Sequence, residues 1–435
     1  MAYPNTGKCR ELLDQIQRYG EMKHEFGAKG VNDAVAEARR ALAAALRKVK
    51  ALPVDPAQGA RKLSELGHIR SLRPRGPRRL WQRVDRAAYR DRVEGALLAR
   101  CAGCTLGAPV EGWAIERMEA LARETGMDFP PTDYWIRVPD PFLKRYGKCE
   151  RREYTRGGMD GVPVDDDTVY TLLGLLVLED SGPDFTVEDV GKAWLEYLPL
   201  ACTAEKVALE NLRQGVPAAK VAEKGNPYCE WIGADIRSDP WGYAAPGWPE
   251  KAAELAWRDA FLSHRREGIY GAMFFSAAIA AAFAVDDPVE ALRIGLTEIP
   301  SACGVAKAVK WALQVAPDIR DFKDAAEAVA RRFPGMHKVH TVNNACLTVW
   351  GLTIGGKDVS KVIGETVAMG YDNDCTAATA GSLVGAVVGR KGVPAKWTRR
   401  FRGTIHAYLV GRERWSIQDV VARFERQALD VHGAA

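Results

Sequence analysis

The sequence predicts a predominantly helical protein, on three observations. Two acidic stretches, residues 164–170 and 370–379, each lead into a run of small and apolar residues. These runs, residues 171–178 and 380–389, have the composition of buried helices. Residues 31–52 place most of their apolar side chains on one face of a helix, as an amphipathic helix does.

Residues 1–85 are expected to form a helical, basic N-terminal extension and linker, ahead of a main domain over residues 86–435. A short amphipathic helix, residues 9–19, precedes the longer one, which Pro53 ends. Residues 70–90 then form a basic stretch that contains Pro and Gly. This stretch could contact nucleic acid or an acidic ligand, but a solvated linker or a docking face is the preferred interpretation.

The main domain opens with a predicted helix over residues 91–106, with small residues on one side. Gly107 and Pro109 end this helix, so Glu111 falls just beyond it. Residues 113–160 are rich in Pro, Tyr and Trp, and we expect them to form a long loop that borders a site. Taken by itself, Glu111 is best interpreted as a surface-loop carboxylate.

Three consecutive aspartates, Asp165, Asp166 and Asp167, stand at the entrance of the first apolar helix. Free backbone N–H groups and the positive end of the helix dipole favour anions at that place. A single Asp is enough to cap a helix, and for either acidic stretch alone capping is the simpler interpretation. Three adjacent carboxylates exceed that need and repel one another.

Asp372 and Asp374 stand at the entrance of the second apolar helix. Carboxylates two residues apart cannot share one face of a helix, so both fit a turn that precedes a helix beginning near Thr376. Gly389 suits the end of that helix. Because the helix is rich in Ala and Gly, we expect it to be buried and to approach its neighbours closely.

The two acidic stretches predict a metal site if they meet in space. As many as five carboxylates would then converge, and like charges at that density need cations to stay ionised. Carboxylate and hydroxyl oxygens are the ligands that Mg²⁺ selects. We therefore expect two Mg²⁺ ions, with Mn²⁺ as an alternative, held by Asp165, Asp166, Asp167, Asp372 and Asp374.

Three motifs in this order resemble those of the ADP-ribosylglycohydrolase family. They are the small-residue segment 95–111, the Asp-Asp-Thr triplet 166–168 and the Gly-x-Asp-x-Asp motif 370–374. The resemblance covers residues from about 88 to the C-terminus. It implies an all-α fold, a compact orthogonal multi-helix bundle, in which residues 86–435 form the catalytic domain. It also implies two Mg²⁺ ions and hydrolysis of the N- or O-glycosidic bond that joins ADP-ribose to a side chain.

The resemblance also implies catalytic roles for Glu111, Asp166 and Asp374. The glutamate that matches Glu111 lies beside the scissile bond in the family and contacts the metal-bound water or the substrate ribose. Asp374 is the expected bridge between the two cations. Metal-assisted hydrolysis would pass through an oxocarbenium-like state, and Glu111 or one of the aspartates would take the proton of the water.

Three positions depart from the family pattern. Asp165 stands where the family has a metal-binding Thr, which keeps oxygen ligation and adds charge. Cys375 replaces a Thr after the last Asp, and a thiol is a poor ligand for a hard metal. This Asp-x-Asp-Cys pattern is similar to that of a bacterial branch of the family. Tyr270 stands where the family often has Asn, which indicates a reshaped pocket.

Further residues are expected to bind the substrate. In the Pro- and Gly-rich segment 232–247, which reads as a structured loop, Asp235 and Arg237 could bind hydroxyls or phosphate, or form a local ion pair. A long helical stretch, residues 252–285, contains a segment that resembles the ADP-ribose cradle of the family. His264 also fits a structural role. Asn343 and Asn344 also fit a role in helix capping. The full expected set is Asp235, Arg237, His264, Gly268, Tyr270, Gly271, Asn343, Asn344 and Tyr371.

Composition and charge argue against several classes of protein. A net charge of +5 over 435 residues argues against a nucleic-acid-binding or membrane-surface protein. The N-terminus lacks the apolar run of a signal peptide, and no segment has the apolar length of a membrane span. The nine cysteines are an odd number, so we expect them to be reduced and buried. These features indicate a cytoplasmic protein.

Three functions fit the sequence. The first is a hydrolase that acts on an ADP-ribosylated protein or small molecule. The second is a hydrolase of a different N- or O-glycoside or nucleoside on the same two-metal scaffold, which Tyr270 and Cys375 favour. The third is a non-catalytic ADP-ribose-binding or interaction protein that works through its N-terminal segment. The retained aspartates argue against the third, because a disused acidic cluster would be a costly repulsive patch.

Overall fold

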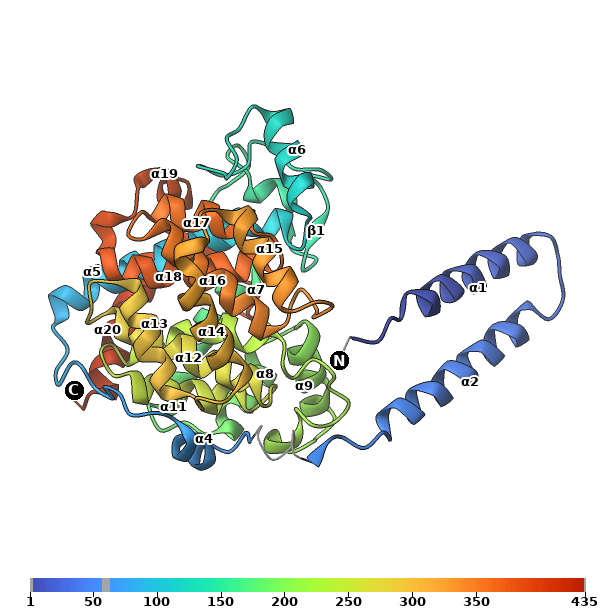
Figure 1. Cartoon of the computed structure of the whole chain (residues 1–435), viewed down its shortest axis with the longest axis horizontal. Coiled ribbons are helices and arrows are strands. Elements are labelled where there is room, and N and C mark those ends of the chain that lie inside the picture. The colour runs from blue at the N-terminus through green and yellow to red at the C-terminus, as the bar shows by residue number, and fades with distance from the viewer. Residues whose placement is uncertain (1–2, 57–62, 434–435) are drawn as a thin grey trace. The chain divides into compact units, whose positions relative to one another are not determined.

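The computed structural model describes residues 3–56 and 63–433, and the chain divides into two compact units between residues 62 and 63. The first unit holds two helices, α1 (Gly7–Glu25) and α2 (Val31–Lys50) (Figure 1). Gly27 and Gly30, in the turn between them, have φ of 71° and 81°, a conformation that glycine adopts at little cost. Neither helix has a buried residue, so the apolar stripe predicted for residues 31–52 stays exposed.

The second unit is built from helices, which confirms the predicted all-α class. The helices of its first half are α4 (Leu66–Leu72), α5 (Arg86–Gly107), α6 (Ile115–Thr125), α7 (Asp166–Ser181), α8 (Val187–Tyr197), α9 (Thr203–Arg213), α10 (Asp239–Ala244) and α11 (Pro249–Ala260). Those of its second half are α12 (Glu267–Ala282), α13 (Pro288–Gly295), α14 (Gly304–Val315), α15 (Phe322–Arg332), α16 (Thr341–Gly355), α17 (Val359–Ala368), α18 (Asn373–Gly392), α19 (Ala395–Thr398) and α20 (Ile417–Val431).

The strands among the described residues form two short antiparallel hairpins. In one, β1 (Lys144–Arg145) pairs with β2 (Cys149–Glu150), and in the other β3 (Thr404–His406) pairs with β4 (Arg414–Ser416). Short 3₁₀ helices include η1 (Ala108–Val110), η2 (Arg151–Tyr154) and η4 (Ile232–Arg237). None of the described helices is long and apolar enough to span a membrane.

Helices α5 and α18 pack against each other at the centre of the second unit, and glycine makes the close approach possible. A Cβ atom on Gly103 would lie 2.1 Å from the carbonyl oxygen of Ala377, and one on Gly385 would lie 2.4 Å from that of Gly95. Most of α18 is buried, as its small-residue composition predicted. The helix kinks at Gly389, where φ is 69°, close to the predicted end.

The basic stretch after α4 is a docking face, one of the two preferred interpretations. Arg78 donates to the carbonyl oxygen of Thr297 at 2.6 Å and pairs with Glu298 at 2.7 Å, and Arg73 pairs with Glu298 as well. Arg70 pairs with Glu254 at 2.7 Å. These contacts tie residues 63–85 to the second unit, and the two compact units divide between residues 62 and 63. The assignment of residues 1–85 to an N-terminal extension and linker stays a prediction.

Four local expectations need correction. Residues 113–160 are not one long loop, because Met118, Leu121 and Ala122 recur at helical spacing and bury one face of α6. The stretch 252–285 is broken between α11 and α12, where Arg266 has φ of 52°. Segment 232–247, expected to be a structured loop without a helix, contains η4 and the short helix α10. The cysteines are all free, but Cys9 and Cys202 are exposed.

Candidate functional site

A cavity of about 470 Å³ lies where the two acidic stretches meet. Among the predicted residues, its wall includes Glu111, Asp166, Asp167, Asp372 and Asp374. The wall also includes residues that the sequence analysis did not select, among them Arg145, Tyr146, Cys202, Thr203 and Glu205. The convergence of the two stretches was the condition for a metal site.

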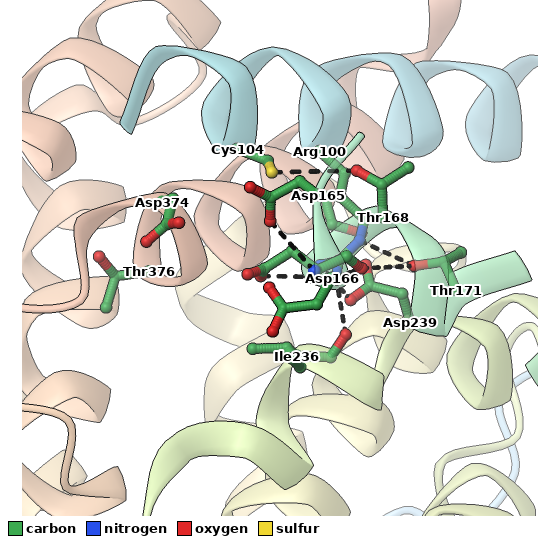
Figure 2. A network of polar contacts seen from close by, with 12 residues as sticks. Arg100, Cys104, Asp165, Asp166, Thr168, Thr171, Ile236, Asp239, Asp374 and Thr376 are labelled. Atoms are coloured by element: carbon green, nitrogen blue, oxygen red, sulfur yellow. Dashed lines mark hydrogen bonds and ion pairs between the residues drawn. The ribbon is translucent and has the colours of Figure 1, made fainter. Parts of the chain in front are cut away.

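The first acidic stretch is held at the N-terminus of α7. Asp165 is the N-cap, and its side chain accepts a hydrogen bond from the backbone N–H of Asp167 at 3.2 Å. The buried Arg100 of α5 donates to the carbonyl oxygen of Asp167 at 2.6 Å and to Thr171 at 3.0 Å (Figure 2). Asp165 therefore caps α7 and does not line the cavity, whereas Asp166 and Asp167 do. The metal-binding role of Asp165 stays a prediction.

The second acidic stretch is held by the turn before α18. Gly370 and Tyr371 have φ of 73° and 64°, which reverses the chain just ahead of Asp372. The backbone N–H of Asp372 donates to the side-chain oxygen of Asn344 at 3.3 Å. Asp374 follows in the first turn of α18, where its side chain is 3% exposed. Helix α18 starts at Asn373, three residues ahead of the predicted Thr376.

Two groups of side chains have the geometry of a metal site. Oxygen atoms of Glu111, Asp372 and Asp374 lie within 4.8 Å of one another. The Cys104 sulfur and one oxygen each of Asp165 and Asp167 form a second such group. Only the fold brings Cys104 beside Asp165, because the two residues lie far apart in the sequence (Figure 2).

The carboxylate oxygens of the two groups fit a hard cation. One side-chain oxygen of Asp167 and one of Asp374 are buried without a hydrogen-bond partner among the described residues. Buried carboxylate oxygens are rarely left in this state, and an oxygen-rich site of this kind suits Mg²⁺ or Mn²⁺.

Burial and mutual repulsion disfavour the ionised form of these carboxyl groups. Burial and the neighbouring Asp165 raise the pKa of Asp166 to about 6. Burial and Asp374 raise the pKa values of Asp167 and Asp372 well above the ordinary range. Burial and Glu111 do the same to the pKa of Asp374. A bound cation would reverse this effect by favouring the carboxylates.

Arg145 and Tyr146 enter the site from the β1–β2 hairpin. The Arg145 guanidinium contacts Glu111 at 3.0 Å, Asp165 at 3.0 Å and Asp374 at 3.2 Å. The Tyr146 hydroxyl donates to Asp166 at 2.6 Å. No motif marked these two residues, which lie in the segment expected to border the site.

Glu205 also lines the cavity and comes from α9. Its carboxylate accepts a hydrogen bond from Arg237 at 3.0 Å, and Arg237 also pairs with Asp259 at 2.8 Å. Burial raises the pKa of Glu205 to about 7, although Arg237 opposes the shift. Arg237 therefore pairs with carboxylates of α9 and α11, and the predicted local ion pair with Asp235 of its own segment does not form.

Several other residues expected to bind substrate are packed inside the second unit. The ring nitrogen Nδ1 of His264 lies 2.8 Å from Ser263 Oγ, and burial lowers the pKa of His264 well below its ordinary value. Both carboxylate oxygens of Asp235 are buried without a hydrogen-bond partner among the described residues. A Cβ on Gly271 would lie 2.3 Å from Asp235, and one on Gly268 would lie 2.7 Å from His264.

The remaining members of that set make backbone contacts. The Tyr270 hydroxyl donates to the carbonyl oxygen of Leu63, Asn343 donates to that of His337 at 2.9 Å, and Asn344 donates to that of Lys338 at 2.6 Å. The half-buried Tyr371 accepts from the Gly112 N–H at 2.9 Å. The cavity wall includes none of the nine, which are Asp235, Arg237, His264, Gly268, Tyr270, Gly271, Asn343, Asn344 and Tyr371. Their substrate-binding roles stay predictions, and Asn344 is placed to support Asp372.

Comparison with known proteins gives three findings. A family model described as ADP-ribosylglycohydrolase matches residues 85–429. A solved structure described as an ADP-ribosylglycohydrolase-related protein complex aligns over 80% of this chain and 99% of that chain, with 20% sequence identity and a TM-score of 0.48. No curated protein matches the chain.

Proposed function

The chain belongs to the ADP-ribosylglycohydrolase family, a family of glycosyl hydrolases, and from that membership we propose a metal-dependent hydrolase that releases ADP-ribose. The bond cleaved is the glycosidic bond between ADP-ribose and a protein side chain or a small acceptor. The observation that carries this proposal is the convergence of Glu111 with both acidic stretches on one cavity. A volume of about 470 Å³ lies within the usual range for cavities that bind small molecules.

The metal ligands in this proposal are the five aspartates Asp165, Asp166, Asp167, Asp372 and Asp374, which would hold two Mg²⁺ or Mn²⁺ ions. Such ions, when bound, polarise the glycosidic bond and lower the pKa of water. Support for this assignment comes from the unpartnered buried oxygens of Asp167 and Asp374. Cys375 is an unsuitable ligand for a hard cation, and burial keeps its thiol protonated by raising its pKa.

Glu111 is the proposed acceptor of the proton from the attacking water. Its side chain is 41% exposed, whereas those of Asp165 and Asp374 are 1% and 3% exposed. A carboxylate at the open side of the cavity reaches both solvent and substrate, and can pass the proton on to solvent. The buried aspartates are instead assigned to metal binding in this proposal.

A hydrolase of another N- or O-glycoside or nucleoside is the second candidate. Tyr270, which replaces the Asn of the family, does not line the cavity, and its hydroxyl is bonded to the Leu63 carbonyl. The cavity therefore lacks the amide that the family often presents at this position. This difference favours a substrate with a different polar pattern.

Single-turnover hydrolysis tests the proposal. The panel is ADP-ribosyl-arginine, ADP-ribosyl-serine, ADP-ribose-1″-phosphate and simple N-ribosides, each with Mg²⁺ and then with EDTA. We expect Mg²⁺-dependent release of ADP-ribose that is lost in Asp374→Asn and kept in Asp184→Asn, whose side chain is 88% exposed. Cleavage of the simple ribosides alone would select the second candidate. No turnover together with no metal binding by calorimetry would overturn both.

A further inference from the structure

Arg145 places a positive charge inside the acidic site. One guanidinium nitrogen donates to Glu111 at 3.0 Å and to the Ala108 carbonyl oxygen at 2.7 Å. The other donates to Asp165 at 3.0 Å and to Asp374 at 3.2 Å. The Arg145 side chain is 15% exposed, so these contacts are largely shielded from water. A single side chain thus joins the end of α5, the start of α7 and the start of α18.

The partners of Arg145 overlap with the candidate metal ligands. Glu111 and Asp374 are two of the three members of one candidate group, and Asp165 belongs to the other. A guanidinium uses its N–H groups to bind the oxygen lone pairs that a divalent cation also needs. On Asp374 the guanidinium binds Oδ2 and leaves Oδ1 without a partner, so a metal ion there would place a second positive charge beside Arg145. On Asp165 the guanidinium holds Oδ2, the oxygen that the cap bond to the Asp167 N–H does not use.

The hairpin that carries Arg145 is small and partly strained. Strands β1 and β2 contain two residues each. In the turn between them, Tyr146 and Gly147 both have positive φ, 53° and 66°, and this conformation is unfavourable for a side chain such as Tyr. Two-residue strands contribute little stability of their own. The β1–β2 ladder is therefore much shorter than the 16-residue α7 or the 20-residue α18, and fewer backbone hydrogen bonds hold it.

We propose that Arg145 is an intramolecular competitor of the divalent cation, which must displace the guanidinium from Glu111 and Asp374 to load the site. This inference rests on the proposed metal-dependent function. Before metal binds, Arg145 neutralises part of the carboxylate charge. When metal binds, the guanidinium moves away and the β1–β2 hairpin rearranges at the edge of the cavity.

Calorimetric titration of the full chain with Mn²⁺ tests the competition. We expect Arg145→Gln to bind Mn²⁺ roughly tenfold more tightly than the wild type, because the metal no longer displaces a charge-assisted pair. Arg152→Gln is the matched control, since Arg152 lies seven residues further on, is 58% exposed and pairs with Glu150 instead. Equal or weaker binding by Arg145→Gln would overturn the competition and leave the metal site standing. No binding by wild type or variant would remove the metal site and the competition together.

Hydrogen exchange in the wild-type chain shows whether the metal ion displaces Arg145 or is only repelled by its charge. This measurement does not depend on the folding of a variant. The Lys148 N–H donates to the Arg145 carbonyl oxygen and the Arg151 N–H donates to that of Leu143, both at 3.0 Å. We expect saturating Mn²⁺ to speed exchange at these two amides and to slow it at the start of α18. Unchanged or slower exchange at both amides with Mn²⁺ bound would contradict the proposal.

Discussion

Gly107 lies directly against the backbone of Asp374. A Cβ atom on Gly107 would lie 2.5 Å from both the backbone nitrogen and the Cα of Asp374, closer than real Cβ contacts come. Gly107 ends α5 and Asp374 lies in the first turn of α18, so the packing of these two helices sets the position of a central carboxylate. The same small-residue packing that forms the core therefore also forms the site.

Gly107→Ala should disturb the site through this contact. The added methyl group must push α5 and α18 apart, which we expect to lower the free energy of unfolding by about 1–3 kcal/mol and to weaken Mg²⁺ binding by moving Asp374. Urea unfolding and metal titration would measure the two effects. Gly67→Ala is the control, because its Cβ would meet nothing within 4 Å in a helix. Wild-type stability and affinity in Gly107→Ala would show that the contact is unimportant.

Asp372→Asn should stabilise the metal-free protein and weaken its response to metal. Burial, Asp374 and Glu111 raise the pKa of Asp372, so the charged form is unfavourable in the fold and an amide removes that repulsion. We expect a higher Tm than the wild type in EDTA, and an Mg²⁺ affinity reduced by roughly 100-fold. Thermal scans with EDTA and with Mg²⁺ would measure both, with the exposed Asp184→Asn as control. An unchanged Mg²⁺-induced rise in Tm would exclude Asp372 as a ligand.

Glu205 should make stability depend on pH. Burial raises its pKa from the ordinary 4.5 to about 7, so between these values the folded chain holds a proton that the unfolded chain releases. The free energy of unfolding should therefore fall as pH rises from about 4.5 to about 7. Urea unfolding at pH 5 and pH 8 should show a smaller difference for Glu205→Gln than for the wild type. Glu210→Gln, on the same helix with a side chain 53% exposed, should keep the wild-type difference.

Arg237 should matter for stability, because it pairs with two buried carboxylates. Its partners Glu205 and Asp259 are 3% and 6% exposed, and removal of the cation would leave both unpaired. We expect Arg237→Gln to lose about 3–5 kcal/mol in urea unfolding. Arg320→Gln, which breaks a pair whose Arg is 81% exposed, should lose less than about 1 kcal/mol. Full stability in Arg237→Gln combined with lost substrate binding would instead support the substrate-binding role.

The acidic part of the site could be predicted because its signals are local. Three aspartates at the start of α7 and two around the start of α18 exceed what capping needs, and their motifs occur in the order expected for the family. The glycine and alanine content of α5 and α18 likewise predicted close helix packing. Such signals are contained in a few consecutive residues, so a reader of the sequence can recognise them.

The residues that surround the aspartates, including the cation Arg145, could not be predicted in this way. Arg145 and Tyr146 belong to a segment whose Pro and aromatic content indicated a loop, and nothing in it pointed to the aspartates. Glu205 and Cys104 sit in ordinary helical patterns. Their roles depend on contacts between segments far apart in the chain, such as the pair of Arg145 with Asp374.

The sequence by itself determined the helical class, the buried apolar helices and the acidic residues that gather at one cavity. Local periodicity, capping chemistry and charge density were sufficient for these conclusions. Only the tertiary structure decided which charges meet. Arg237 pairs with the buried Asp259, and Arg145 lies among the carboxylates of the site. Electrostatic energy depends on distance and burial, and the spacing of residues along a chain determines neither for segments that are far apart.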